Sequence, residues 1–184
     1  LKIELRQKFK QKRDDFFAQS SPQALKTGIA QNLQKVLGSI AQPKSTWATY
    51  KPIQSEADPS GIYSETSLNW CYPVIRGNSL EFFVPQGEWG LNSFKVQEPN
   101  PKTSLAVELK DVQGVLVPGI AFDLNGHRLG CGKAYYDQTL KNYSGLKIGI
   151  AYSVQITDLL PFDKHDIPMD FVVTEKEVLE RKVS

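Results

Sequence analysis

Residues 114–137 read GVLVPGIAFDLNGHRLGCGKAYYD and carry the clearest indication of the architecture. The nearly unbroken apolar run 114–122 is typical of a strand that is buried on both faces of a sheet. A loop with three glycines follows it, and Tyr-Tyr-Asp then begins a helix that we expect to pass Leu140 and Tyr143. In α/β proteins such a loop lies beyond the carboxyl end of a strand, where ligands bind.

The remaining pattern extends this interpretation over the whole chain. Ser21-Pro22 is a typical helix start, and Gly38 is expected to end that helix after Leu37. Helices are therefore predicted at 2–19, 22–37 and 60–69, strands at 46–50, 71–75, 80–84, 147–152 and 170–175, a loop at 89–101, and a polar helix or tail at 175–182. Alternating strands and helices predict a three-layer α/β/α sandwich, Rossmann-like, with a largely parallel sheet. The length of 184 residues suits a single domain over 1–184.

Composition excludes several classes of protein. Hydrophobic residues make up 40% and charged residues 23% of the chain, as in ordinary soluble domains. No apolar run approaches the roughly 20 residues that a membrane helix needs, and the net charge of +2 argues against a dedicated nucleic-acid binder. Two cysteines are too few for a disulfide framework or a four-cysteine zinc site, so we expect free thiols and a cytoplasmic location.

The loop after residue 122 has the composition of a phosphate site. Its three glycines, which allow close approach of a ligand to the backbone, are Gly126, Gly130 and Gly132. Arg128 and Lys133 add positive charge, and Asp137 could hold the Mg²⁺ that accompanies nucleotide phosphates. The spacing matches neither the P-loop nor the dinucleotide-binding turn, so composition alone leaves a simple turn as an alternative.

Other candidates are weaker by themselves. Lys2 and Arg6 share one face of a helix, which favours either phosphate contact or a solvated basic surface. Glu56 follows a predicted strand and could accept hydrogen bonds from a ligand ring or lie on a surface loop. Asp166 is either a turn former or a metal ligand, and His127 is either a general base or an exposed loop residue.

The segment VPGIAFDLNGHRLGCGKAYYDQTL resembles the signature of the 5-formyltetrahydrofolate cyclo-ligases, also called 5,10-methenyltetrahydrofolate synthetases. That family reads PG-hydrophobic-x-F-D, then G-x-RLG, a glycine pair and YYD. KIELR, ATYKPIQSEAD, CYPVI, KIGIAYSVQ and LLPFDKHDIPMD follow the family order along nearly the whole chain. Two positions depart from it: Ala134 replaces a third glycine, and Phe94 lies near where some members place a substrate-stacking tryptophan.

The resemblance implies an enzyme that uses ATP and Mg²⁺ to convert 5-formyltetrahydrofolate into 5,10-methenyltetrahydrofolate, releasing ADP and phosphate. The formyl oxygen would be phosphorylated first, and N10 of the folate would then attack the activated carbon. Two alternatives stay open: an ATP-dependent paralogue that acts on another amide-like substrate, and a non-catalytic folate- or nucleotide-binding module. In each case the partners are small molecules rather than nucleic acid or membrane, and we expect a monomer.

The resemblance also implies roles for individual residues. Lys133 and Arg128 would be catalytic, neutralising charge during phosphoryl transfer, and Asp137 and Asp166 would hold Mg²⁺. ATP would be contacted by Lys2, Ile3, Glu4, Leu5, Arg6, Arg128, Leu129, Gly130, Cys131, Gly132, Lys133, Ala134, Tyr135 and Tyr136. The folate substrate would be contacted by Tyr50, Lys51, Glu56, Cys131, Gly132, Lys133, Ala134 and Tyr135.

Overall fold

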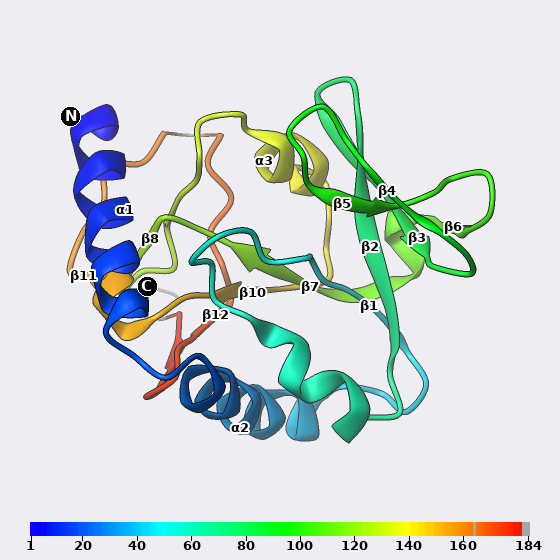
Figure 1. The fold of residues 1–184 in the computed structure, drawn as a ribbon, viewed down its shortest axis with the longest axis horizontal. Helices are drawn as coiled ribbons and strands as arrows, with labels where there is room; N and C mark the ends of the chain where they lie inside the picture. Colours follow the sequence, from blue (N-terminus) through cyan, green and yellow to red (C-terminus); the bar gives the residue numbers. More distant parts are fainter. Residues whose placement is uncertain (164, 182–184) are drawn as a thin grey trace.

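The computed structural model describes residues 1–163 and 165–181 (Figure 1). The helices are α1 (Lys2–Ala18), α2 (Pro22–Ile40) and α3 (Tyr135–Leu140), with 3₁₀ turns η1 (Pro59–Glu65), η2 (Leu109–Asp111) and η3 (Ser153–Gln155). The strands are β1 (Thr46–Ala48), β2 (Asn69–Arg76), β3 (Ser79–Val84), β4 (Trp89–Leu91), β5 (Gln97–Pro99), β6 (Leu105–Val107), β7 (Val112–Pro118), β8 (Ala121–Asp123), β9 (Arg128–Leu129), β10 (Leu146–Ile150), β11 (Ile156–Thr157), β12 (Phe171–Val173) and β13 (Val178–Glu180). Across these described segments, no helix combines the length and apolarity needed to cross a bilayer.

The centre of the molecule is an eight-stranded sheet in the order β13-β12-β10-β7-β1-β2-β3-β6. The five strands from β12 to β2 run parallel, and the remaining strands pair antiparallel at the two edges. The middle strand β7 is buried on both faces from Val115 to Val117, which explains its unbroken apolar sequence. The predicted α/β fold with a largely parallel sheet is confirmed.

Each face of the sheet has its own core. Helix α2 packs Ile29, Leu33 and Leu37 against one face, together with η1 (Figure 1). Its apolar residues recur at the spacing that places them on one side of a helix. The other face is covered by α3 and the loops around it, through residues such as Leu140. Helix α1 lies beside the β8–β9 hairpin, where Phe9 joins a third small core.

Several elements differ from the sequence prediction at their ends. Helix α2 continues through Gly38 to Ile40, and nothing packs against the space that a side chain at Gly38 would occupy. The apolar run 114–122 is two strands, because Pro118 and Gly119 end β7 and the chain then enters a separate small sheet. The predicted helix after the glycine loop ends at Leu140, and the predicted helix at 60–69 is the 3₁₀ turn η1.

Two predictions about secondary structure were wrong. Residues 89–101, predicted to be a loop, contain the antiparallel hairpin β4–β5. Trp89 anchors this hairpin by packing edge-on against Tyr72 of β2, with ring centroids 4.9 Å apart. The predicted helix or tail at 175–182 instead contains strand β13, which pairs with β12 and extends the sheet; residue 182 lies outside the described residues. Both segments are antiparallel hairpin pairings that their polar composition does not indicate.

Candidate functional site

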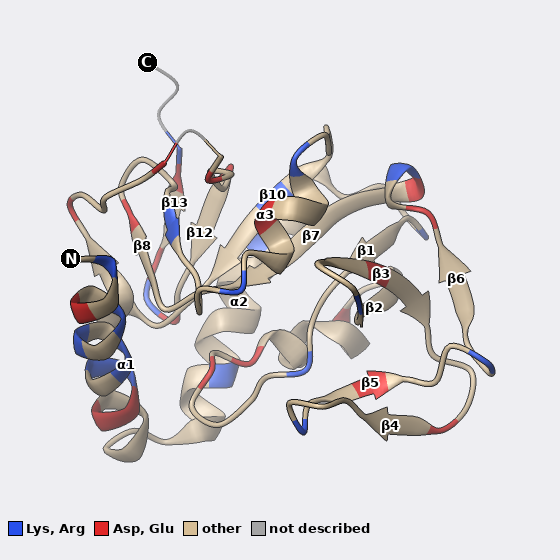
Figure 2. Cartoon of the chain, turned by 90° about the horizontal axis from the view of Figure 1, so that it is seen from above, with Lys and Arg blue, Asp and Glu red and all other residues tan. Residues whose placement is uncertain are grey.

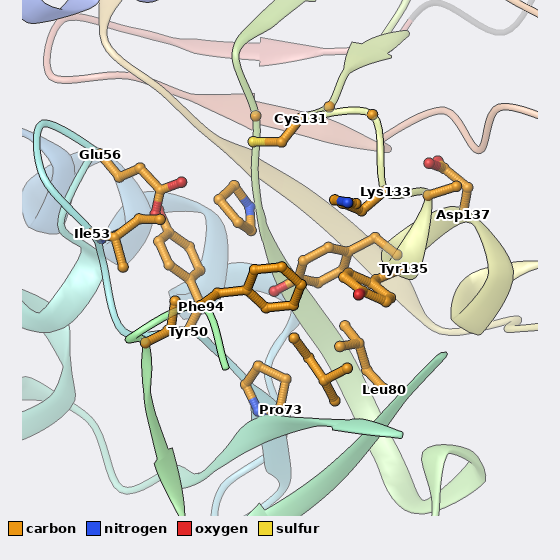
Figure 3. A pocket seen from close by; sticks show the side chains of 18 of the residues that line it. Tyr50, Ile53, Glu56, Pro73, Leu80, Phe94, Cys131, Lys133, Tyr135 and Asp137 are labelled. Atoms are coloured by element: carbon orange, nitrogen blue, oxygen red, sulfur yellow. The ribbon is translucent and has the colours of Figure 1, made fainter. Parts of the chain in front are cut away.

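A cavity of about 540 Å³ opens beyond the carboxyl ends of β1 and β7 (Figure 3). One wall is the glycine loop, and the opposite side is formed by β2, β3 and the β4–β5 hairpin. The first turns of α1 and the segment after β1 complete it. This is the position where parallel α/β sheets bind ligands, so the architecture agrees with the location predicted from the glycine loop.

Most of the predicted site residues meet at this cavity. Those that line it are Lys2, Arg6, Tyr50, Lys51, Glu56, Arg128, Leu129, Gly130, Cys131, Gly132, Lys133, Ala134, Tyr135, Tyr136, Asp137 and Asp166. Three predicted ATP contacts do not line it, because they project from other sides of α1. Ile3 is 69% exposed, Glu4 pairs with the N-terminal amine, and Leu5 packs into the small core beside β8.

The base of the glycine loop is held by a buried carboxylate, Asp123. One oxygen accepts the backbone N–H groups of Asn125 and His127 at 2.9 Å, and the other accepts the Leu160 N–H at 3.0 Å. His127 also bonds to Asp123 and stacks on Phe162, and it does not line the cavity. These contacts indicate that His127 supports the structure of the loop, and that Asp123, the aspartate of the F-D pair, anchors it.

An ion pair joins strand β9 to helix α3 across the glycine loop. Arg128 donates from Nη2 to Asp137 at 2.8 Å and from Nη1 to the Pro118 carbonyl at 3.3 Å. The Arg128 side chain is only 7% exposed, so it forms a fixed part of the wall. Lys133 is placed differently, with an exposed side chain whose Nζ lies 5.7 Å from the centre of the Phe94 ring. Of the two predicted catalytic cations, Lys133 has more freedom to follow a moving phosphate.

Helix α1 is rich in basic residues (Figure 2), and two of them, Lys2 and Arg6, line the cavity. Arg6 donates to the Gly130 carbonyl at 2.8 Å, and Lys2 contacts Asp163 at 2.8 Å and Asp166 at 2.9 Å. Burial acts to lower the pKa of Lys2, but its two carboxylate partners outweigh burial and hold that pKa above its ordinary value. Burial likewise acts to raise the pKa of Asp166, and hydrogen bonds from Lys2 and a backbone N–H keep it lowered.

The opposite end of the cavity is suited to a ring system. Glu56 accepts the Ile53 N–H at 3.1 Å, and its carboxyl group faces the cavity (Figure 3). Burial raises the pKa of this carboxyl group. Tyr50 donates to the Ala57 carbonyl at 2.5 Å and thereby fixes the segment that carries Glu56. Lys51 lies 4.7 Å from the centre of the Trp89 ring, at the base of the hairpin.

Sequence reasoning missed one complete side of the cavity. The additional lining residues include Tyr72, Pro73, Ile75 and Leu80 from β2 and β3, Asn92, Val96, Gln97 and Glu98 from the hairpin region, and Asp163 beside α1. Phe94, already noted as a departure from the family pattern, is 50% exposed and faces the cavity from the hairpin (Figure 3). In the sequence, the signals of this wall are the CYPVI segment and an aromatic residue, Phe94, within a polar segment.

Asp137 and Asp166 reach the cavity from different sides. Within the described part of the chain, no group of three or more His, Cys, Asp or Glu residues could hold a metal. Two carboxylates nevertheless fit Mg²⁺ that arrives with a nucleotide, because this ion commonly binds through one or two carboxylates, phosphate oxygens and water. In the structure each carboxylate is paired with a cation instead, Asp137 with Arg128 and Asp166 with Lys2.

Comparison with known proteins identifies the family of the chain. The model of the 5-formyltetrahydrofolate cyclo-ligase family matches residues 2–175. The 5-formyltetrahydrofolate cyclo-ligase of Mycolicibacterium smegmatis is 28% identical over 170 residues, which cover 85% of this chain and 87% of that protein. The Escherichia coli K12 enzyme of the same name is 35% identical over 113 residues, and the match spans only 62% of its length.

Two solved structures share the fold. The 5,10-methenyltetrahydrofolate synthetase of Aquifex aeolicus is 35% identical, with a TM-score of 0.80, over 100% of this chain and 94% of that one. The Mycoplasma pneumoniae 5,10-methenyltetrahydrofolate synthetase is 27% identical, with a TM-score of 0.72, over 95% and 98%. With the family model matched from residue 2 to residue 175, the chain belongs to the 5-formyltetrahydrofolate cyclo-ligase family.

Proposed function

We propose that the protein converts 5-formyltetrahydrofolate into 5,10-methenyltetrahydrofolate and couples the reaction to cleavage of ATP into ADP and phosphate. The observation that carries this proposal is the position of the glycine loop. Residues 128–137 line one cavity that also contains basic side chains of α1 and, at its other end, Glu56 among apolar and aromatic residues. A single loop can therefore contact both substrates, as transfer between a γ-phosphate and a formyl group requires.

The proposed chemistry proceeds in two steps. The oxygen of the formyl group carried by N5 attacks the γ-phosphorus, the bond between the γ-phosphorus and the bridging oxygen of the β-phosphate breaks, and ADP leaves. The N10 lone pair then attacks the activated formyl carbon, N10 loses its proton, and phosphate departs with the original formyl oxygen. Because the reacting groups belong to the substrates, the protein acts mainly through positioning and neutralisation of charge.

Residues around the cavity suit those two tasks. Lys133 would follow the transferred phosphoryl group, because its side chain is exposed at the cavity and is not in an ion pair within the described residues. Arg128, Lys2 and Arg6 would bind the nucleotide phosphates from fixed positions. Glu56 would accept hydrogen bonds from N–H groups of the pteridine ring. Side-chain contacts of Ile3, Glu4 and Leu5 with ATP receive no support from their placement on α1.

Mg²⁺ would be held by Asp137 and Asp166, directly or through water. When bound with ATP, the ion would neutralise phosphate charge. For Mg²⁺ to bind there, Arg128 would have to release Asp137 and Lys2 would have to release Asp166. Both cations would then contact phosphate oxygens of the nucleotide instead. The same cations would thus hold the carboxylates before the nucleotide binds and the phosphates afterwards.

A paralogue that acts on another amide-like substrate is the second candidate. Ala134 lies in the glycine loop with φ of +55°, where the family pattern has glycine, and Phe94 lines the cavity from the hairpin. Both residues could alter the shape of the substrate site. We further expect a cytoplasmic monomer that acts on small molecules, and the two free cysteines, Cys71 and Cys131, are compatible with a reducing compartment.

An assay of product and nucleotide together tests the proposal. Protein is mixed with 5-formyltetrahydrofolate and MgATP, methenyltetrahydrofolate is followed by its absorbance, and ADP is measured in parallel. We expect equal amounts of the two products. ATP binding without methenyltetrahydrofolate formation at high protein concentration would exclude the cyclo-ligase reaction and favour the second candidate.

A further inference from the structure

The inward face of α1 contains one cation that the proposed reaction has not used. Lys2, Arg6, Phe9 and Arg13 follow each other at intervals of four, three and four residues, which places them on one side of the helix. Lys2 and Arg6 line the cavity and Phe9 is part of a core. Arg13 is also buried, with 3% exposure, although its lysine neighbours in the sequence are exposed.

Arg13 is bound to the segment that carries Glu56. Its Nε donates to the Ser55 hydroxyl at 3.1 Å, and the Ser55 hydroxyl donates to Asp14. The ion pair between Arg13 and Asp14 is loose, at 3.8 Å. Nη1 of Arg13 is buried without a hydrogen-bond partner among the described residues, so the local contacts do not fully satisfy this guanidinium.

The position of Glu56 explains what a buried cation can do here. Glu56 follows Ser55 directly, lines the cavity and bonds to the Ile53 N–H through its carboxylate. Burial raises the pKa of Glu56, while the Ile53 hydrogen bond and the charge of Arg13 act to lower it. Arg13 does not line the cavity, so its charge acts on the carboxylate from behind.

The other titratable groups facing Glu56 do not supply positive charge. Tyr50 belongs to the same segment, Cys131 and Tyr136 come from the glycine loop and α3, and the Tyr152 hydroxyl donates to the Glu56 carbonyl at 3.3 Å. The pKa of each of these four groups is raised, chiefly by desolvation, so all four are neutral at pH 7. Arg13 is thus the cation whose charge opposes protonation of Glu56.

We propose that Arg13 is a positioning residue for Glu56: it fixes the 53–57 turn through Ser55 and keeps the Glu56 carboxylate charged toward N–H donors of the substrate ring. This inference rests on the proposed function, because it takes Glu56 as the contact to the pteridine ring. It concerns substrate recognition alone. Nucleotide binding at the other end of the cavity is independent of it.

The experiment measures the Kd of 5-formyltetrahydrofolate and of ATP between pH 5 and pH 8. The variants are Arg13→Met, Arg13→Lys, Glu56→Gln and the double variant Arg13→Met/Glu56→Gln, with exposed Lys12→Met as the matched control on the same helix. At neutral pH, Arg13→Met should weaken folate binding about tenfold, as expected for loss of a charge-assisted contact. Its ATP affinity should stay within about twofold of the parent.

The pH dependence gives the more specific result. Because Arg13 lowers the pKa of Glu56, removing it should move the loss of folate binding on acidification to a higher pH. Arg13→Lys should restore part of this shift, since it keeps the charge. In the Glu56→Gln background, Arg13→Met should change folate affinity by less than about twofold, because its effect passes through the carboxylate. Lys12→Met should match the parent throughout.

The outcomes are distinguishable. An unchanged folate affinity and pH profile in Arg13→Met would overturn the inference, as would a full tenfold loss that persists in the Glu56→Gln background. If Arg13→Met lacks a cooperative thermal transition, Arg13→Lys carries the test. The inference is then overturned if Arg13→Lys has the pH profile of the parent and also leaves folate affinity unchanged in both Glu56 backgrounds. A parent protein that binds ATP but no folate at any pH would instead refute the proposed function.

Discussion

Replacement of Ala134 by glycine should stabilise the protein. Ala134 has φ of +55° and ψ of +16° at the start of α3, in the left-handed region that disfavours a side chain. Its methyl group is exposed, so little packing is lost when it is removed. The residue also makes no side-chain capping bond to the helix. The backbone conformation therefore determines the effect of the substitution.

The expected gain follows from two opposing terms. A residue with a Cβ in the left-handed helical region costs roughly 1–2 kcal/mol relative to the right-handed one, and glycine removes this cost. Glycine also gives the unfolded chain more conformational freedom, which reduces this gain in stability by roughly 0.4–1 kcal/mol. The difference favours Ala134→Gly by about 1 kcal/mol in the free energy of unfolding.

Urea denaturation at equal protein concentration measures this difference. The control is Ala24→Gly in α2, which is exposed and helical and should lose about 0.5 kcal/mol. The denaturant slope should be the same for both variants, since neither changes the buried surface appreciably. If Ala134→Gly destabilises the protein as Ala24→Gly does, the strained conformation assigned to Ala134 is incorrect.

Three further predictions test the site and its supports. Lys133→Ala should lower kcat about 100-fold and weaken the binding of 5-formyltetrahydrofolate far less, whereas Lys141→Ala should match the parent; equal turnover in both variants would remove Lys133 from the mechanism. Asp166→Asn should lower thermal stability at neutral pH, because the bond from Lys2 helps to hold the carboxyl pKa below its ordinary value of 3.8. That contribution is present above pH 3.8 and disappears as the pH falls through the lower folded pKa, so the two melting curves should converge in acid, and a constant gap would contradict the ion pair. Gly126→Ala should cost more than about 2 kcal/mol in urea denaturation, because φ is +80° and a Cβ would lie 2.4 Å from a backbone carbonyl oxygen; a loss below about 1 kcal/mol would argue against this geometry.

The parts of the fold that sequence could predict are those with strong local signals. Strand β7 is apolar from Val115 to Pro118 because it lies in the middle of the sheet, and the glycine loop comes shortly after it, beyond the short strand β8. Ser21 and Pro22 correctly mark the start of α2, where the Ser21 hydroxyl caps the helix. Lys2 and Arg6 also reach the cavity together, as their spacing on one helix face predicts.

The parts that sequence could not predict depend on pairing and packing that local composition does not indicate. The β4–β5 hairpin has the composition of a loop, and its anchor is the packing of Trp89 on Tyr72. Strand β13 forms because β12 offers a free edge. Arg13 belongs to a run of basic residues that resembles a solvated face, and only the three-dimensional structure places it against Ser55. Local composition carries no information about such pairings.

The central claim is that the formyl oxygen of the folate accepts the γ-phosphoryl group of ATP. The most direct measurement uses 5-formyltetrahydrofolate that carries ¹⁸O in its formyl group, with unlabelled MgATP in unlabelled water. Mass analysis of the released phosphate should find one ¹⁸O atom for each methenyltetrahydrofolate formed. Unlabelled phosphate, with the label lost to water instead, would contradict the account.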